Sequence, residues 1–209
     1  MEQTELTAMF TQKAEAVSAV VKPVKDMGQA LEETVNICAE KQACQVLASG
    51  CSLDLSPEAE DLCGLKDWEK IIAAPDLDDK TLDDLQKLCR QNNIALIRQG
   101  LHAHLGGIDV GLTTAAFGLA ETGTIVQDSA SEDLRLATMI SESHIALLPA
   151  SRICAASFDL ERQMEEFFSA GAAYLAFITG ASRTADIERV LTLGVHGPLE
   201  LRVLILMNM

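Results

Sequence analysis

The first half of the chain repeats its apolar positions with the period of an α-helix. Apolar residues recur three and four positions apart over 3–21 and again over about 29–48, and Pro23 separates these two segments. A third amphipathic segment, 82–91, follows Thr81, a residue of the type that caps helices. The pattern therefore predicts a helical N-terminal portion, residues 1–92, that packs on the rest of the domain through its apolar faces.

From residue 94 onward, the pattern changes to short apolar runs that are typical of buried strands. These runs are 94–98, 109–113, 123–127, 145–148, 173–178 and 201–207, and helical spacing lies between some of them, over 132–141, 160–170 and 185–193. The first three runs are separated by short turns, so we expect part of the sheet to be antiparallel. The sequence predicts a three-layer α/β core over 93–209, and one single domain overall.

Composition restricts the location and the partners of the protein. The 209 residues are 48% hydrophobic and 22% charged, which is typical of a globular protein. No apolar run reaches the roughly 18 residues of a membrane span, and the first ten residues lack the features of a secretory signal. We therefore expect a cytoplasmic protein without a membrane span. The net charge of −15 argues against a nucleic-acid partner, because it would repel phosphates.

The cysteines and histidines do not form a recognisable metal motif. None of the six cysteines belongs to a C-x-x-C pair; they stand at 38, 44, 51, 63, 89 and 154. We expect free buried thiols, with a metal or redox role as the alternative. His102 and His104 would point the same way on a strand, but no third ligand is evident. We expect no metal and no cofactor in this chain.

The first candidate site is the turn after the apolar run 173–178. Gly180 breaks that run, and Ser182 or Thr184 offers a cap to a helix expected to start near Ala185 and to end at Gly194. Free backbone N–H groups at such a helix start favour an anion, and Arg183 adds a positive charge. The turn therefore predicts a small anionic ligand, whereas the alternative is an ordinary capped turn.

Two further candidates lie at the ends of predicted strands. Glu121 precedes Thr122, Gly123 and Thr124, which lead into an apolar run, and a carboxylate at a sheet edge can act as a base or a nucleophile. His196 stands in a His-Gly-Pro corner and can transfer a proton near pH 7. The alternatives are a structural carboxylate held by hydroxyl and amide groups and a turn histidine bonded to a carbonyl.

Two stretches of the chain resemble a known family. DVGLTTAAFGLAETGTIVQDS at 109–129 and GASRTADIERVLTLGVHGP at 180–198 are similar to the lactate-utilisation protein C family, whose shared module is the LUD domain. The two stretches have the family's order and separation, and the resemblance covers roughly the second half of the chain. The family usually has Pro where Ala181 stands.

The resemblance implies both a fold and a function. The fold would be a Rossmann-like sheet similar to that of ribose-5-phosphate isomerase, glucosamine-6-phosphate deaminase and coenzyme A transferases. The function would be that of a subunit that acts with iron–sulfur partner proteins in oxidising L-lactate to pyruvate, with the iron–sulfur clusters in the partners. The alternative is a stand-alone enzyme or sensor that binds a small phosphorylated or coenzyme A thioester substrate.

Overall fold

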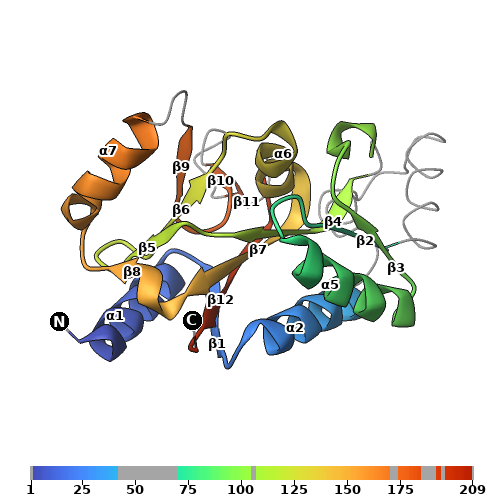
Figure 1. The fold of residues 1–209 in the computed structure, drawn as a ribbon, viewed down its shortest axis with the longest axis horizontal. Coiled ribbons are helices and arrows are strands. Elements are labelled where there is room, and N and C mark those ends of the chain that lie inside the picture. The colour runs from blue at the N-terminus through green and yellow to red at the C-terminus, as the bar shows by residue number, and fades with distance from the viewer. Residues whose placement is uncertain are drawn as a thin grey trace.

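A six-stranded parallel sheet forms the centre of the protein (Figure 1). The computed structural model describes residues 2–41, 70–104, 107–169, 174–184, 192–193 and 196–208. All neighbouring strands of the central sheet are parallel. In spatial order they are β1 (Ala19–Val24), β12 (Glu200–Leu206), β7 (Ser141–Pro149), β4 (Ile108–Thr114), β2 (Lys70–Ala73) and β3 (Ile94–Ile97).

A second, smaller sheet contains antiparallel pairs, although not between the predicted strands 94–98, 109–113 and 123–127 that the short turns separate. Its strands are, in spatial order, β8 (Ile153–Cys154), β5 (Phe117–Leu119), β6 (Thr124–Asp128) and β9 (Leu175–Ile178). Strand β6 is antiparallel to both β5 and β9. The short turn between β5 and β6 thus joins neighbours in this sheet, whereas β3 and β4 are separated in the central sheet by β2.

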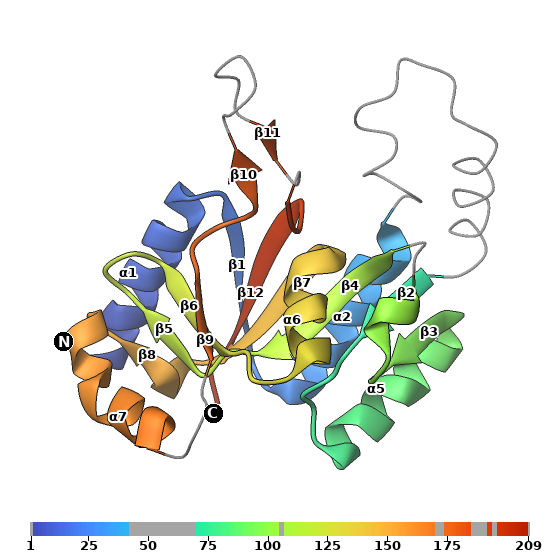
Figure 2. The same ribbon diagram turned by 90° about the horizontal axis from the view of Figure 1, so that it is seen from above.

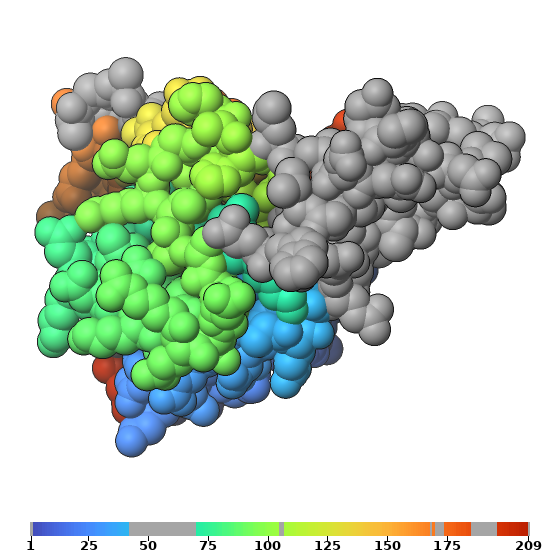
Figure 3. Space-filling view, turned by 90° about the vertical axis from the view of Figure 1, so that its right-hand side faces the viewer, coloured from blue at the N-terminus to red at the C-terminus, as the bar shows by residue number. Residues whose placement is uncertain are grey.

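Helices cover both faces of the central sheet (Figure 2). One face packs against α2 (Met27–Glu40) and α5 (Asp79–Gln91), which lie side by side in Figure 3. The other face packs against α6 (Glu132–Ile140), α1 (Gln3–Ala16) and the smaller sheet, which is in turn covered by α7 (Glu161–Ser169). The described elements also include three short 3-10 turns: Leu101–Ala103, Ala150–Arg152 and Ser157–Leu160. The predicted three-layer α/β fold is therefore confirmed.

The buried strands show why both faces must be covered. In β7, Ile145 and Leu147 pack with the α2 and α5 cluster, whereas Ala146 and Leu148 pack with the α1 cluster. Successive side chains of a strand point to opposite faces, so a run that is apolar throughout needs an apolar neighbour on each side. This is the physical reason why the continuous apolar runs identified the central strands.

The first predicted helix is too long. It ends at Ala16, and Ala19–Val24 form β1 instead of the helical end predicted over 17–21. Ser18 has φ 68°, which turns the chain away from the helix axis. Pro23 lies within the strand, where it is tolerated because β1 is at the edge of the sheet. With β2, the expected helical portion 1–92 thus supplies two of the six central strands.

The other two N-terminal helices are present with different starts. Asp78 caps α5 by accepting hydrogen bonds from Thr81 N and Thr81 Oγ1 at 3.0 and 2.6 Å, so the predicted Thr81 cap is wrong. Asp26 caps α2 in the same way through Gln29 N. The expected continuation of this helix over 42–48 lies outside the described residues.

The predicted helix 185–193 is wrong at its C-terminal end. Thr192–Leu193 form a strand, β11, that pairs antiparallel with Arg183–Thr184, which form β10. Residues 185–191 lie outside the described part of the chain. The strands predicted over 173–178 and 201–207 are present as β9 and β12, and the short strands β10 and β11 lie between them.

Candidate functional site

A cavity of about 240 Å³ lies between α6, β9 and the turn at Gly180. We call it the His144 cavity, because His144 of β7 lines it and is only 1% exposed. Residues 196–198 and Leu201 contribute another side of the cavity, and Arg135, Ser129 and Tyr174 contribute polar groups. The cavity thus combines an apolar wall with a small number of polar side chains, as ligand pockets do.

A chain of hydrogen bonds fixes the protonation of His144. Gln127 Nε2 donates to Thr114 O at 2.9 Å, so Gln127 Oε1 is an acceptor, and it accepts from Thr113 Oγ1 at 3.0 Å. The hydroxyl hydrogen of Thr113 is therefore used, and Thr113 Oγ1 must accept from His144 Nε2 at 2.8 Å. His144 then carries its proton on Nε2, and Nδ1 keeps a lone pair.

Burial keeps this histidine neutral. It lowers the pKa of His144 to about 4, because removal from water disfavours the charged imidazolium. At pH 7, the ring is therefore a hydrogen-bond acceptor at Nδ1 and a weak base. Such a group suits a ligand that donates a hydroxyl hydrogen.

Arg135 supplies a positive charge to the same cavity. Its Nη1 donates to the carbonyl oxygens of Ser129 and Ala130 at 2.7 and 3.1 Å, and its guanidinium carbon lies 6.0 Å from the centre of the Tyr174 ring. These contacts hold the side chain in one place. A fixed guanidinium near a neutral acceptor favours a small molecule with both a carboxylate and a hydroxyl.

Three of the predicted site residues line the His144 cavity: Gly180, Ser182 and His196. Ser182 N donates to Pro198 O at 3.1 Å, which joins the glycine turn to the His-Gly-Pro corner. His196 is exposed. The structure therefore brings together the ends of the second family-like stretch, although Ser182 and Pro198 are 16 positions apart in the chain.

Two other residues of that stretch do not line this cavity. Arg183 is exposed and Thr184 is half-buried, and both belong to β10. The helix start expected directly after them, near residue 185, lies outside the described residues. The predicted anion at this turn therefore stays a prediction.

Glu121 also lies away from the cavity. It is exposed, and its Oε1 accepts a hydrogen bond from Ser157 N at 3.0 Å. The hydroxyls of Thr122, Thr124 and Thr179 form a chain with separations of 2.7 and 2.8 Å, which ends next to Gly180. The Thr122 to Thr124 segment thus supports the wall of the cavity, while the Glu121 carboxylate holds the turn that begins at Ser157.

Gly123 and Gly180 are required by the close approach of α1. Both have positive φ, at 67° and 73°. A Cβ on Gly123 would lie 2.1 Å from Ala14 N, and a Cβ on Gly180 would lie 2.0 Å from Val17 O. Both turns therefore rest against the C-terminal end of the same helix, which gives these glycines a structural role.

The cysteines in the described part of the chain are free. Cys38 and Cys89 are buried, and burial raises their pKa values to about 12 and about 11. The expectation of buried free thiols is confirmed for these two, and Cys154 is half-buried. The remaining three, at 44, 51 and 63, lie outside the described residues.

His102 and Ala103 belong to a 3-10 turn, and His104 follows it, so the expected strand geometry is wrong here. Within the described ranges, no group of three or more His, Cys, Asp or Glu side chains is placed to hold a metal ion.

The sequence alone did not indicate His144 and Arg135 as candidate residues. His144 directly precedes the apolar run 145–148, and a histidine inside a buried strand was the available signal. Its partners lie on β4 and β6, so its hydrogen bonds depend on strand pairing. Arg135 belongs to an amphipathic helix, and in the sequence it resembles any arginine on a solvated helix face.

Comparison with known proteins identifies the family. Residues 7–206 match the LUD domain, so this α/β protein belongs to the LUD domain family. The match includes most of the first half of the chain, where the two sequence stretches had shown no resemblance. The suspected relationship to the lactate-utilisation protein C family is confirmed at the level of the family.

Relatives of known name support this assignment. The chain is 35% identical over 94 residues to lactate utilization protein C of Shouchella clausii, covering 44% of this chain and 41% of that protein. It is 34% identical over 111 residues to lactate utilization protein C of Geobacillus thermodenitrificans, covering 52% and 46%. The matched regions thus span less than half the length of these relatives.

A solved structure shares the fold. The crystal structure of a DUF162 family protein from Deinococcus radiodurans superposes with a TM-score of 0.58 over 99% of both chains, at 16% sequence identity. This likeness concerns the fold alone. In the described residues of the present chain, no helix has the length and apolar character needed to cross a membrane.

Proposed function

We propose that this protein is a cytoplasmic subunit similar to lactate utilisation protein C, acting with iron–sulfur partner proteins in the oxidation of L-lactate to pyruvate. Family membership over 7–206 and the named relatives support this proposal. The reaction removes two electrons and two protons from lactate. In this proposal the electrons leave through iron–sulfur clusters of the partners, and this chain binds the lactate.

The His144 cavity carries the binding part of the proposal. Lactate has a carboxylate and, on the adjacent carbon, a hydroxyl. The Arg135 guanidinium suits the carboxylate, and the lone pair on His144 Nδ1 suits the hydroxyl hydrogen. Ser182 and His196 also line the cavity and offer further hydrogen bonds. The ligand is therefore expected in this cavity, with the β10 residues outside the site.

A binding experiment separates this site from the one predicted by the sequence. L-lactate and pyruvate are titrated calorimetrically into the wild type, Arg135→Gln and Arg183→Gln, which remove the same charge at two places. We expect at least tenfold weaker binding in Arg135→Gln and an unchanged dissociation constant in Arg183→Gln. The reverse pattern would place the anion at the 180–184 turn.

The role with partners needs a cellular test. A strain that lacks this gene is complemented with the wild type or with Arg135→Gln, and growth on L-lactate and co-purified iron–sulfur proteins are measured. We expect the wild type alone to restore growth and to retain the partners. Full lactate oxidation in the deletion strain would contradict the proposal.

Turnover of sugar phosphates or coenzyme A thioesters by the isolated chain would favour the stand-alone enzyme.

A further inference from the structure

A second cavity, of about 500 Å³, lies at the edge of the sheet where β7 and β12 begin. We call it the Glu142 cavity, because Glu142 and Ser143 of β7 line it together with Lys41 at the end of α2. The cavity is distinct from the His144 cavity, and the two have no described lining residue in common. The proposed lactate site makes no use of it.

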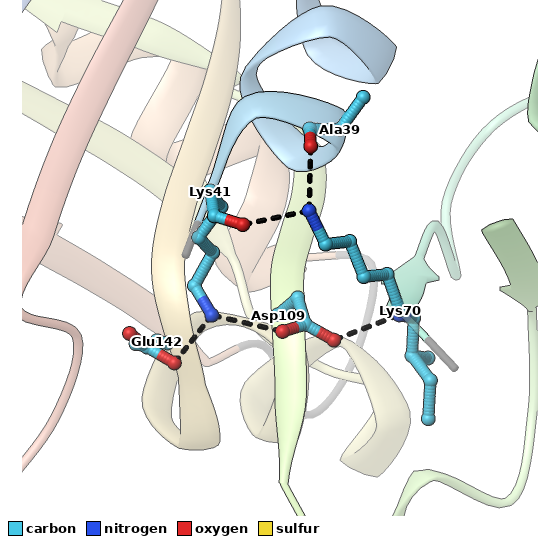
Figure 4. Close-up of polar contacts among 6 residues, drawn as sticks. Ala39, Lys41, Lys70, Asp109 and Glu142 are labelled. Carbon is cyan, nitrogen blue, oxygen red and sulfur yellow. Dashed lines mark hydrogen bonds and ion pairs between the residues drawn. The ribbon is translucent and has the colours of Figure 1, made fainter. Parts of the chain in front are cut away.

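An ion-pair network forms part of its wall (Figure 4). Lys41 Nζ lies 2.8 Å from Asp109 Oδ1 and 2.6 Å from Glu142 Oε2, and these three side chains are 8%, 3% and 8% exposed. Burial alone would lower the pKa of Lys41, but its hydrogen bonds to the two carboxylates raise it. The ammonium therefore stays charged and uses one oxygen of Glu142.

The other oxygen of Glu142 and the hydroxyl of Ser143 differ from this ion pair. Both Glu142 Oε1 and Ser143 Oγ are buried, and neither has a hydrogen-bond partner among the described residues. The two residues are 9% and 4% exposed. A buried polar atom without a partner costs roughly 1–3 kcal/mol, so the fold retains two unpaired acceptors on the wall of one cavity.

The charge of the wall selects the kind of ligand. Four glutamates and two cations line the cavity: Glu33, Glu40, Glu142 and Glu200 against Lys41 and Arg202. Negative charge thus exceeds positive charge by two. A carboxylate oxygen only accepts hydrogen bonds, so the complementary group is a positively charged donor.

Two further observations distinguish an organic cation from a metal ion. Ile37 and Leu199 line the cavity and provide apolar contact for a short aliphatic stem. In the described part of the chain, the carboxylates here do not form a group of three that could hold a metal. An ammonium on a carbon chain fits both the acceptors and the apolar wall.

We propose that the Glu142 cavity binds a small aliphatic amine, whose ammonium donates hydrogen bonds to Glu142 Oε1 and Ser143 Oγ while its carbon chain contacts Ile37 and Leu199. The amine adds the positive charge that the wall lacks. This site is independent of lactate binding, so failure of either proposal leaves the other unaffected.

The test uses n-butylamine and putrescine as probes and 1-butanol as the uncharged analogue of butylamine. Calorimetric titration of the full chain at pH 7 is expected to detect both amines and no binding of the alcohol. Ser143→Ala removes one acceptor with little change in volume, and Glu142→Gln replaces the charged acceptor. We expect each variant to weaken amine binding at least tenfold.

Glu32→Gln is the matched control, because Glu32 is an exposed residue of α2 that lies outside the cavity lining. It is expected to change the dissociation constant less than twofold. The proposal is overturned if neither amine binds, if 1-butanol binds equally well, or if binding survives in both Ser143→Ala and Glu142→Gln. Stronger stabilisation by Mg²⁺ that is lost in Glu142→Gln would also overturn it, in favour of a metal site.

Discussion

Glu142 and His144 are two residues apart on β7 and both are buried, yet their surroundings differ. His144 ends a neutral chain in which Thr113 and Gln127 satisfy each other and the imidazole. Glu142 shares a buried cation with Asp109, and its Oε1 has no hydrogen-bond partner in the described part of the chain. The neutral hydrogen-bond chain of His144 is thus completed by side chains of neighbouring strands, whereas the buried carboxylate of Glu142 depends on a cation from the end of α2.

The largest effect is expected from breaking the charged network. Lys41→Met removes the cation between two buried carboxylates, and loss of one member of a buried pair costs about 3–5 kcal/mol. Urea denaturation should show this decrease in the free energy of unfolding. Lys87→Met breaks the exposed pair with Asp84 and should leave the midpoint unchanged. An equally stable Lys41→Met protein would show that the network has no energetic importance.

The next effect concerns pH, since His144 is kept neutral. Its pKa is about 4 in the folded protein and 6.5 in the unfolded chain. The unfolded state therefore binds a proton first as pH falls, so stability is fully present above pH 6.5 and is lost as pH falls toward 4. The loss is roughly 3 kcal/mol.

Asp76 has the opposite influence. Burial raises its pKa from 3.8 to about 6, so the folded state holds the proton more tightly and stability is lost as pH rises through this window. The two contributions oppose each other in the wild type. Between pH 4 and 7, His144→Gln should become less stable as pH rises, and Asp76→Asn should become more stable. Identical pH profiles for the two variants would contradict both assignments.

A third change tests the wall of the His144 cavity. Gly180→Ala places a Cβ 2.0 Å from Val17 O at positive φ, so we expect a loss of more than about 2 kcal/mol. Gly100→Ala is the matched control, because Gly100 has φ 74° and open space around it, and only the backbone cost of about 1–2 kcal/mol applies. Equal destabilisation of the two variants would show that the contact with α1 is unimportant.

The smallest effect is expected from the hydrogen bonds that join Gln127, Thr113 and His144. Thr113→Val keeps the shape of the side chain but leaves His144 Nε2 and Gln127 Oε1 without their shared partner, which should cost roughly 1–2 kcal/mol. Thr7→Val removes a hydroxyl that donates to a helical carbonyl at the surface. The free energy of unfolding should therefore change by no more than about 0.5 kcal/mol. Thermal unfolding compares the two. If Thr113→Val is as stable as Thr7→Val, the hydrogen bonds of Thr113 do not order the imidazole of His144.

The pattern of apolar residues was sufficient to predict the strands that consist of a short apolar run. The strands predicted over 94–98, 109–113, 123–127, 145–148 and 201–207 are present, because each run is mainly apolar and short. Pattern failed for β1, where Val20 and Val21 continue a helical spacing but pair with β12. It failed again at β11, whose partner lies across residues 185–191.

Sequence by itself determined the apolar strands, the amphipathic helices and the family to which their glycine-rich connections belong. Tertiary structure decided which polar residues meet. His144, Thr113 and Gln127 come from three strands and two sheets, and Lys41 reaches Glu142 across about 100 residues. Helix and strand periodicity is a property of neighbouring residues, whereas the pKa of a buried group depends on partners that only the folding of distant segments supplies.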